Sequence, residues 1–321
     1  MRLLAPLVAL LLLTTAAPAA AHAEKAAHAE KAAHPGPGVL PTLRHNLVAA
    51  YDFEHPAWGD PARERDQGRS GTDITLVNGG AAMRTRDGSH RGSRHSIQLQ
   101  QVNPAVLGND DWKAGVYADP GVPALRAFNA VKGVTVMGWF KMTGQNPSPN
   151  SNTESPDDLY GAIGLAGVLS GNSQGHDVRA LLELITVNGE LRVVALARRV
   201  DGGSSQTFAA DEPWQSMLPP AEWVFLAATF DFDTATMRLY RNGRALDGFY
   251  TLTGDPWAVE GPPEPDLASP TDPRGIKIGG SFPQNTREQN PCNCRMDDLM
   301  FLDRVAAPIE VWAQYKLATR G

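Results

Sequence analysis

The most informative shortage in this sequence is cysteine, which occurs only at Cys292 and Cys294 in a chain of 321 residues. Two cysteines exclude the disulfide-rich scaffolds that small secreted domains use in place of a large core. Basic residues are also few, since 29 Lys and Arg against 35 Asp and Glu give a formal net charge of −6. We therefore expect no nucleic-acid partner and no electrostatic binding to an anionic membrane.

Several catalytic signatures are missing as well. No Gly-rich phosphate loop is present, and no stretch carries the Glu-x-Asp-x-x-Glu pattern that places the two carboxylates of a retaining glycosidase about 5 Å apart. Glu183 and Glu190 fall on the two arms of one predicted hairpin, where we expect solvated rim carboxylates. Gly171–Gly175 has the spelling Gly-x-Ser-x-Gly, but it joins two predicted strands, whereas a nucleophile elbow needs a strand, a turn and a helix. The sequence thus predicts a protein that is not an enzyme.

The N-terminus has the features of a secretory signal peptide. Arg2 and a near-continuous apolar run from Leu3 to Leu13 are followed by an Ala-x-Ala ending. A membrane anchor needs about 20 apolar residues, and this run is shorter, so we expect a cleaved signal peptide. Cleavage is expected after Ala23, with Ala21 as the alternative. Residues 24–45 then form a leader rich in Ala, His, Glu and Lys. A secreted, extracellular protein is predicted, and its Ala- and Gly-rich composition suits a bacterial source.

The rest of the chain, residues 46–321, alternates short apolar runs with turn residues and predicts an all-β domain. Asn188-Gly189 and Asn242-Gly243 predict tight hairpin turns, because both residue types tolerate positive φ. We expect hairpins over Leu182–Arg198 and Ala227–Phe249. Expected strands lie near Leu47–Phe53, Asp73–Val77, His95–Gln100, Val134–Met142, Gly161–Leu169, Arg179–Val187, Leu191–Arg198, Trp223–Asp231, Thr236–Arg241, Ala245–Thr251, Gly275–Gly279 and Met296–Leu302.

One helix closes the predicted domain, over Pro308–Leu317, with Ile309, Trp312 and either Tyr315 or Lys316 at helical spacing, and we expect Trp312 to dock it. About a dozen strands and one terminal helix favour a two-sheet antiparallel sandwich of the jelly-roll kind. Three segments look inserted between strands, namely Val102–Ala130, Gln145–Asp158 and Gly254–Pro273.

The order of these strands resembles the laminin-G-like group of the concanavalin A-like lectin/glucanase superfamily. The motifs that carry the resemblance run in the family's order through nearly the whole predicted domain. They are Leu47–Glu54, Asp66–Gly71, Thr75–Gly79, Val134–Lys141, Glu222–Asp231, Met237–Gly243, Ile276–Gly280 and Arg295–Phe301. The resemblance implies a concanavalin A-like jelly roll, but the family includes lectins, adhesive domains and glycosidases, so it does not settle function.

The resemblance also implies a structural calcium ion that fastens the first strand to the last. The matching positions are Asp52, Glu54, the neighbourhood of Gly92, and Asp297. Calcium takes six to eight hard oxygen ligands, which carboxylates, carbonyls and waters could supply. The alternative is that Asp297 and Asp298 flank a strand, with one of them hydrogen-bonded to a turn and the other solvated. For Cys292 and Cys294, a disulfide within the Cys-x-Cys unit, two free thiols and intermolecular bonds all remain open.

Sugar recognition would need exposed aromatic rings with polar neighbours. Trp139 and Trp223 occupy strand positions that the family buries, so ligand contacts are expected from residues in the loops. The candidate ligand-binding residues are Asp110, Asp111, Trp112, Tyr117, Trp214 and Trp257.

Taken together, these patterns predict a secreted, monomeric binding module that recognises an extracellular glycan or a protein surface. Two alternatives stay open: a polysaccharide hydrolase or lyase with an unrecognised site, and a structural or adhesive domain of the cell envelope.

Overall fold

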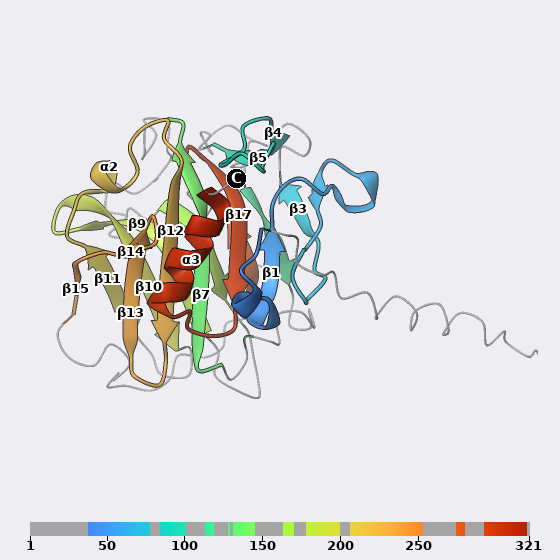
Figure 1. Cartoon of the computed structure of the whole chain (residues 1–321). Helices are drawn as coiled ribbons and strands as arrows, with labels where there is room; N and C mark the ends of the chain where they lie inside the picture. Colours follow the sequence, from blue (N-terminus) through green and yellow to red (C-terminus); the bar gives the residue numbers. More distant parts are fainter. Residues whose placement is uncertain are drawn as a thin grey trace, which may run out of the picture. The chain divides into compact units, whose positions relative to one another are not determined.

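The computed structural model describes residues 38–77, 84–100, 113–118, 128, 131–144, 163–169, 178–199, 206–252, 274–279 and 292–319. All of them belong to one compact unit, residues 33–321. They form two antiparallel sheets with a short C-terminal helix, which confirms the predicted all-β sandwich (Figure 1). Within these described residues, no helix is long and apolar enough to cross a membrane.

Sheet A contains both the first and the last strand of the domain. Its order is β14-β13-β12-β7-β17-β5-β4, and β1 pairs with β17 beside this path. The strands are β1 Leu47–Tyr51, β4 Arg84–Thr85, β5 Ser96–Leu99, β7 Gly133–Met142, β12 Val224–Asp231, β13 Thr236–Arg241, β14 Arg244–Ala245 and β17 Cys294–Leu302. Because β17 hydrogen-bonds to β1, β5 and β7, it links parts of the sheet that are distant in the sequence.

Sheet B has the order β15-β11-β10-β9-β8-β16-β6-β3-β2. The strands are β2 Arg63–Glu64, β3 Ile74–Val77, β6 Lys113–Ala118, β8 Ile163–Leu169, β9 Val178–Val187, β10 Glu190–Arg199, β11 Gln206–Ala210, β15 Gly248–Tyr250 and β16 Arg274–Ile278. The sequence did not predict β6, which falls in a segment that looked inserted but pairs with both β3 and β16.

The two Asn-Gly turns have the backbone that the sequence predicts, with positive φ at Asn188, Gly189, Asn242 and Gly243. The first joins β9 to β10 as expected. The second hairpin is shorter than predicted, because β14 ends at Ala245 and the chain then crosses to sheet B as β15. At this crossing a Cβ on Gly248 would lie 2.3 Å from the Ala209 carbonyl oxygen, so a larger residue could not pair there.

The main hydrophobic core lies between the two sheets and takes side chains from both. A second core covers the outer face of sheet A, where α3 Pro308–Thr319 and η1 Pro41–Asn46 pack over Met137, Trp139 and Phe225. Leu43 in η1 is fully buried there, so the folded region begins before residue 46. The short elements η2 Ala57–Gly59 and α2 Trp214–Met217 complete the described structure.

The helix docks on the sheet through Tyr315, as its spacing predicts, but not through Ile309 or Trp312. Val311, Gln314 and Ala318 are buried, whereas Ile309 is 67% exposed and Trp312 is 39% exposed. The physical reason is Gln314, whose amide accepts a hydrogen bond from the Leu40 N–H at 2.8 Å and donates one to the Gly38 carbonyl at 2.8 Å. A polar side chain thus occupies the buried face, and hydrophobic periodicity alone could not identify it.

Candidate functional site

Asp297 lies at a bulge in β17 that turns two neighbouring aspartates in different directions. The pairing of β17 with β7 shifts between Asp297 and Met300, and Asp298 adopts a left-handed backbone with φ of 47°. Asp297 is fully buried, whereas Asp298 is only partly buried. A bulge that re-aims side chains next to a polar site is a common feature of β-sheets.

The buried carboxylate of Asp297 accepts hydrogen bonds from three groups. Its Oδ2 accepts from the Ser89 N–H at 2.8 Å and from the Ser93 hydroxyl at 2.7 Å. Its Oδ1 accepts from the Asp298 N–H at 2.8 Å. Burial raises the pKa of Asp297 well above its ordinary value, and the neighbouring charge of Asp298 raises it further. The carboxylate is therefore in an environment that a nearby positive charge would stabilise.

Glu54 reaches the same region from the end of β1. The chain leaves β1 through Phe53, which has a left-handed φ of 57°. The Glu54 carboxylate accepts from the backbone N–H of Arg94, from the N–H of His95 at 2.6 Å, and pairs with His95 Nδ1 at 2.7 Å. Burial alone would raise the pKa of Glu54, but these bonds outweigh it and lower the pKa below its ordinary value. Glu54 is therefore held in its charged form.

Ser93 Oγ lies where these groups meet. It is 2.7 Å from Asp297 Oδ2, 3.1 Å from the His95 carbonyl oxygen and 3.4 Å from Glu54 Oε1. A hydroxyl carries one hydrogen, so it can donate to only one of three acceptor oxygens at a time. We call Glu54, Ser93, His95 and Asp297 the Asp297 cluster. Its two carboxylates, one carbonyl and one hydroxyl are hard oxygen donors of the kind that calcium prefers.

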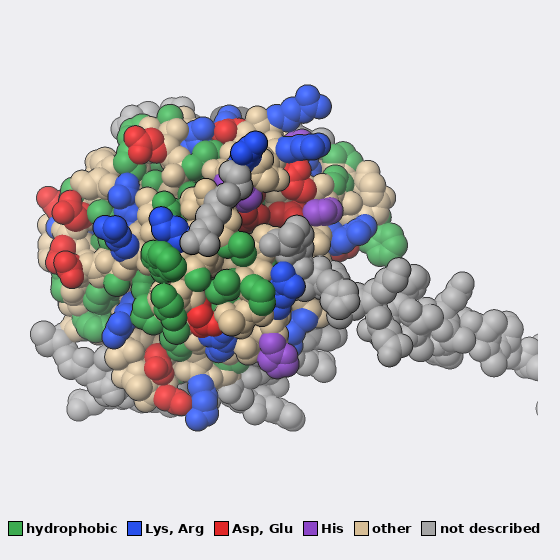
Figure 2. Space-filling model, viewed as in Figure 1, with side chains coloured by type: hydrophobic (Ala, Val, Ile, Leu, Met, Phe, Trp, Pro, Cys, Tyr) green, Lys and Arg blue, Asp and Glu red, His purple; other side chains and the backbone are tan. Residues whose placement is uncertain are grey.

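The loop that brings Ser93 to the cluster is anchored on both sides. Asp87 pairs with Lys141 at 3.0 Å and with Arg295, whereas His90 Nε2 lies 2.6 Å from Asp298 Oδ2. In Figure 2, histidine and acidic side chains gather in the region where Figure 1 places β5 and β17. Gly92 is exposed and its N–H donates to His90 Nδ1, so the predicted position lies one residue from the side chain that contacts Asp297.

Asp52, the fourth predicted calcium residue, belongs to a separate group. Its Oδ1 accepts from the Glu54 N–H at 3.0 Å and lies 2.9 Å from His55 Nδ1. Ligand atoms of Asp52, His55 and Glu64 lie within 4.8 Å of one another. Arg84 Nη1 is 2.6 Å from Glu64 Oε2, however, so a guanidinium already neutralises the buried carboxylate. Among the described residues no guanidinium pairs with Glu54 or Asp297, so we take the Asp297 cluster as the candidate cation site.

Only two of the six predicted ligand-binding residues, Tyr117 and Trp214, fall within the described part of the chain. Asp110, Asp111, Trp112 and Trp257, like the Gly171–Gly175 segment, lie outside the described residues. Tyr117 lies in β6 opposite Gly275. Trp214 is 7% exposed and belongs to the main core, so the expectation of a surface ring at that position does not hold. Its first-turn place in α2 explains the burial, because the helix docks through Trp214 and Met217.

Glu183 is also buried, at 1% exposure, and is not the solvated rim residue that the sequence predicts. Glu183 pairs with Val194 and Glu190 with Val187, so the two glutamates are four residue pairs apart along the hairpin. At about 3.4 Å per residue they are separated by roughly 14 Å. This exceeds the distance of about 5–10 Å between the carboxylates of glycosidases.

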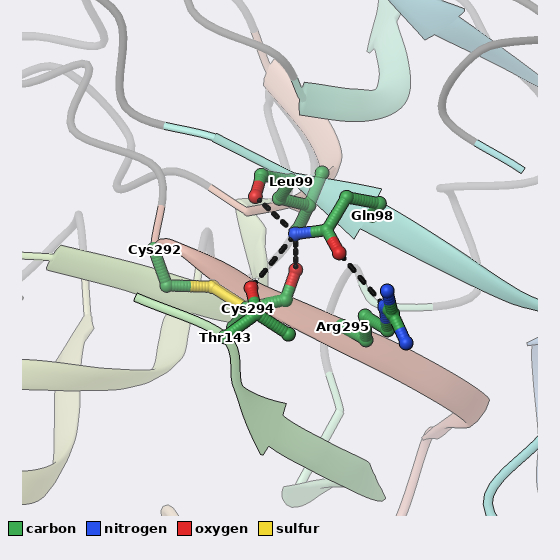
Figure 3. The surroundings of a disulfide bond; sticks show 6 residues. All are labelled: Gln98, Leu99, Thr143, Cys292, Cys294 and Arg295. Atoms are coloured by element: carbon green, nitrogen blue, oxygen red, sulfur yellow. Dashed lines mark hydrogen bonds between the residues drawn. A yellow bond between two sulfur atoms is a disulfide. The ribbon is translucent and has the colours of Figure 1, made fainter. Parts of the chain in front are cut away.

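Cys292 and Cys294 form a disulfide next to the start of β17, with Cα atoms 5.2 Å apart (Figure 3). Both side chains are fully buried in the main core. Beside them the Gln98 amide donates to the Cys294 carbonyl at 3.1 Å and to Thr143 Oγ1 at 2.9 Å, as Figure 3 shows. These contacts fix the strand end that leads to Asp297.

Comparisons with known proteins identify no family. No protein-family model matches the sequence, and no curated protein matches it. Among solved structures, the fold is similar to that of Trypanosoma rangeli sialidase in complex with the inhibitor DANA, with a TM-score of 0.44 and 13% identity over 92% of this chain and 37% of that one.

The fold is also similar to the binding domain of botulinum neurotoxin serotype G, with a TM-score of 0.47 and 10% identity over 85% of this chain and 51% of that one. For the binding domain of Paraclostridial Mosquitocidal Protein 1, the TM-score is 0.47 and the identity 14%, over 85% of this chain and 52% of that one. This chain thus spans between 37% and 52% of the length of these three structures. Likeness at these identities does not indicate what this chain binds.

Proposed function

We propose that this protein is a secreted, monomeric binding module of the laminin-G-like type. In this proposal Ca²⁺ fastens the sandwich at the Asp297 cluster, and the module recognises an extracellular glycan or a protein surface. The observation that carries the calcium proposal is the meeting of two carboxylates and one carbonyl around the single hydroxyl of Ser93. Bound calcium would supply the positive charge that the buried Asp297 carboxylate lacks.

The role of the ion in this proposal is structural. Glu54 follows β1, Ser93 and His95 precede β5, and Asp297 lies in β17, so one ion would join three separate segments of sheet A. An ion that binds only the folded chain stabilises it by mass action. In this proposal the hydroxyl and the carboxylates of the cluster serve as ligands of the ion, so we assign them no catalytic step.

Thermal unfolding with added calcium, with magnesium and with a chelator tests the ion. We expect calcium to raise the melting temperature, because a ligand at 100 times its Kd adds about 2.7 kcal/mol to the free energy of unfolding. Asp297→Asn, which keeps the shape but removes the charge, should abolish this response, and Glu54→Gln should weaken it. Asp60→Asn, at an exposed aspartate, is the matched control and should respond like the unchanged protein. An unchanged melting temperature in saturating calcium would exclude the site.

A glycan array and polysaccharide pull-down on the full chain, with and without calcium, test the binding role. We expect intact glycan to be retained and no sugar to be released into the supernatant. Released or unsaturated sugars would show an enzyme instead. If no glycan is retained, the proposal that the ligand is a glycan fails and a protein partner is the remaining form of the proposal.

A further inference from the structure

A groove lies between α3 and the β13–β14 hairpin, on the outer side of sheet A. It has a volume of about 300 Å³, which is at the lower end of the range of small-ligand sites. We call it the α3 groove. Its lining residues are Arg241, Asn242, Arg244, Trp312, Tyr315 and Lys316.

The walls of the α3 groove are fixed by close packing. Gly243 has a φ of 77°, and a Cβ at this position would lie 2.9 Å from the Trp312 Cα, so the hairpin turn touches the helix backbone. Asn242 Oδ1 accepts from the Phe225 N–H at 3.0 Å. The Tyr315 ring packs against Trp139, with ring centroids 5.8 Å apart. A ligand would therefore enter a preformed shape, which reduces the entropic cost of binding.

Three of the residues that line the groove carry a positive charge, namely Arg241, Arg244 and Lys316. In the part of the chain that the structure describes, no carboxylate forms an ion pair with Arg241, Arg244 or Lys316, whereas Arg84 and Arg304 pair with glutamates at 2.6 and 2.7 Å. Arg241 Nε donates to the Met217 carbonyl at 2.8 Å, which fixes the orientation of the guanidinium. Three unpaired cations in a protein of net charge −6 indicate a local site for an anionic group.

The aromatic residues of the groove indicate what kind of ligand would carry the anionic group. Trp312 is 39% exposed although it lies on a docked helix, and its Nε1–H has no hydrogen-bond partner among the described residues. Lys316 Nζ lies 5.3 Å from the centroid of the Tyr315 ring, so charge and ring face adjoin. Figure 2 shows Lys and Arg side chains next to hydrophobic ones over α3 and the neighbouring strands. A rigid, amphipathic ring beside hydrogen-bond donors suits the apolar face and hydroxyls of a sugar.

We propose that the α3 groove binds an acidic saccharide unit, such as a uronate or a sulfated sugar within a polysaccharide. Arg241, Arg244 and Lys316 contact the carboxylate or sulfate, and the Trp312 ring carries the sugar face. This inference rests on the proposed role as a glycan-binding module and gives that module a ligand class and a location. Polyphosphate has the anionic groups but no sugar face for the Trp312 ring, so it should bind more weakly than an acidic polysaccharide.

The test measures binding of the full chain by affinity electrophoresis in gels that contain polygalacturonate, dextran sulfate, neutral dextran or polyphosphate. We expect binding to the two acidic polysaccharides, and binding to dextran and polyphosphate that is weaker by about tenfold or more. Lys316→Glu should weaken binding by about tenfold, and Trp312→Ala by about fivefold or more. Lys132→Glu is the matched control, because it makes the same charge change at a side chain that is 83% exposed and outside the groove. Its affinity should stay within about twofold of the unchanged protein.

Each result decides between distinct conclusions. Equal loss in Lys316→Glu and Lys132→Glu, or equal binding of polyphosphate, would overturn the inference, because it would reveal only diffuse charge attraction. Binding of neutral dextran that Lys316→Glu leaves intact would overturn the α3 groove as the site while the proposed glycan-binding role stands. If none of the four polymers binds but other glycans are retained on the array, the α3 groove is likewise excluded as the site, and the proposed glycan-binding role stands. Melting temperatures of the three variants show whether a lost signal reflects unfolding.

Discussion

At the scale of single residues, Asp66 shows how one buried carboxylate holds the start of the domain in place. It is 1% exposed, and it accepts hydrogen bonds from the N–H groups of Ala50 at 2.8 Å, Gly68 at 2.7 Å and Thr72 at 3.1 Å. The Ser70 hydroxyl donates to it as well. Burial raises the pKa of Asp66, so these donors offset the cost of the buried charge only in part.

We therefore expect Asp66→Ala to lower the free energy of unfolding by about 3 kcal/mol, because it leaves the buried N–H groups of Ala50 and Gly68 without an acceptor. Urea denaturation followed by circular dichroism measures this change. Asp60→Ala is the matched control, since Asp60 is exposed and accepts from a single N–H, that of Ala62. It should cost less than about 1 kcal/mol. Equal losses in the two variants would contradict the role given to Asp66.

At the scale of secondary-structure elements, α3 is held to the sandwich by an ion pair at its first turn. Glu310 accepts from Arg304 through both oxygens, at 2.7 and 2.8 Å, and also from the Ala307 N–H at 3.0 Å. The Arg304 guanidinium is the main cause that lowers the pKa of Glu310 from 4.5 to about 2. A lowered carboxyl pKa contributes stability that is present above the unfolded value and is lost as the pH falls toward the folded value.

Glu310→Gln should accordingly lower the free energy of unfolding at pH 7 by about 1–2 kcal/mol, after allowance for solvent screening at this partly exposed pair. The difference between the two proteins should shrink as the pH falls from 4.5 to about 2. Thermal unfolding at several pH values measures it. A difference that stays constant over this range would show that the carboxylate charge is not the cause.

Most of the strands could be predicted from the sequence, because strands in a two-sheet sandwich produce a local pattern of apolar runs and turn residues. The β9–β10 hairpin follows directly from Asn188-Gly189. Strand β6 was not predictable, since Lys113–Ala118 lies among loop-like residues and is a strand only because β3 and β16 pair with it. The burial of Trp214 and the exposure of Trp312 likewise depend on tertiary packing.

The candidate site was predictable only in part for a similar reason. The resemblance pointed to Glu54, Asp297 and the neighbourhood of Gly92, and the structure places Glu54 and Asp297 next to Ser93. The role of Ser93 depends on a loop that the Asp87 ion pairs hold in place and on the bulge at Asp298. Neither feature produces a residue pattern that could be recognised in the sequence. The α3 groove was missed because its six lining residues come from a hairpin and a helix some 70 positions apart.

At the scale of the whole molecule, sheet A is completed by residues that come last in the chain. Strand β17 pairs with β1, β5 and β7. In the β1–β17 pair, Leu302 near the end of the chain lies opposite Leu47. Contacts between residues so distant in sequence form late and slowly, because the loop-closure entropy must be overcome first.

A chain that ends at residue 291 should therefore fail to fold, since it lacks β17 and α3 and leaves the sheet A core without its centre. We expect such a fragment to show no cooperative thermal transition by circular dichroism, while the full chain shows one. A fragment with a cooperative transition would show that sheet B and the remaining strands form an independent folding unit.

The two hydrogen bonds that Gln314 makes with the backbone of Gly38 and Leu40 have a mechanical consequence. Where the chain enters the domain, its backbone is bonded to the last helix through two hydrogen bonds of 2.8 Å each. A pull on the segment that precedes Gly38 is thus transmitted first to α3 and only afterwards to the β1–β17 pair. We therefore expect a force applied at the N-terminal end of the domain to act on α3 through Gln314 before it separates the paired strands.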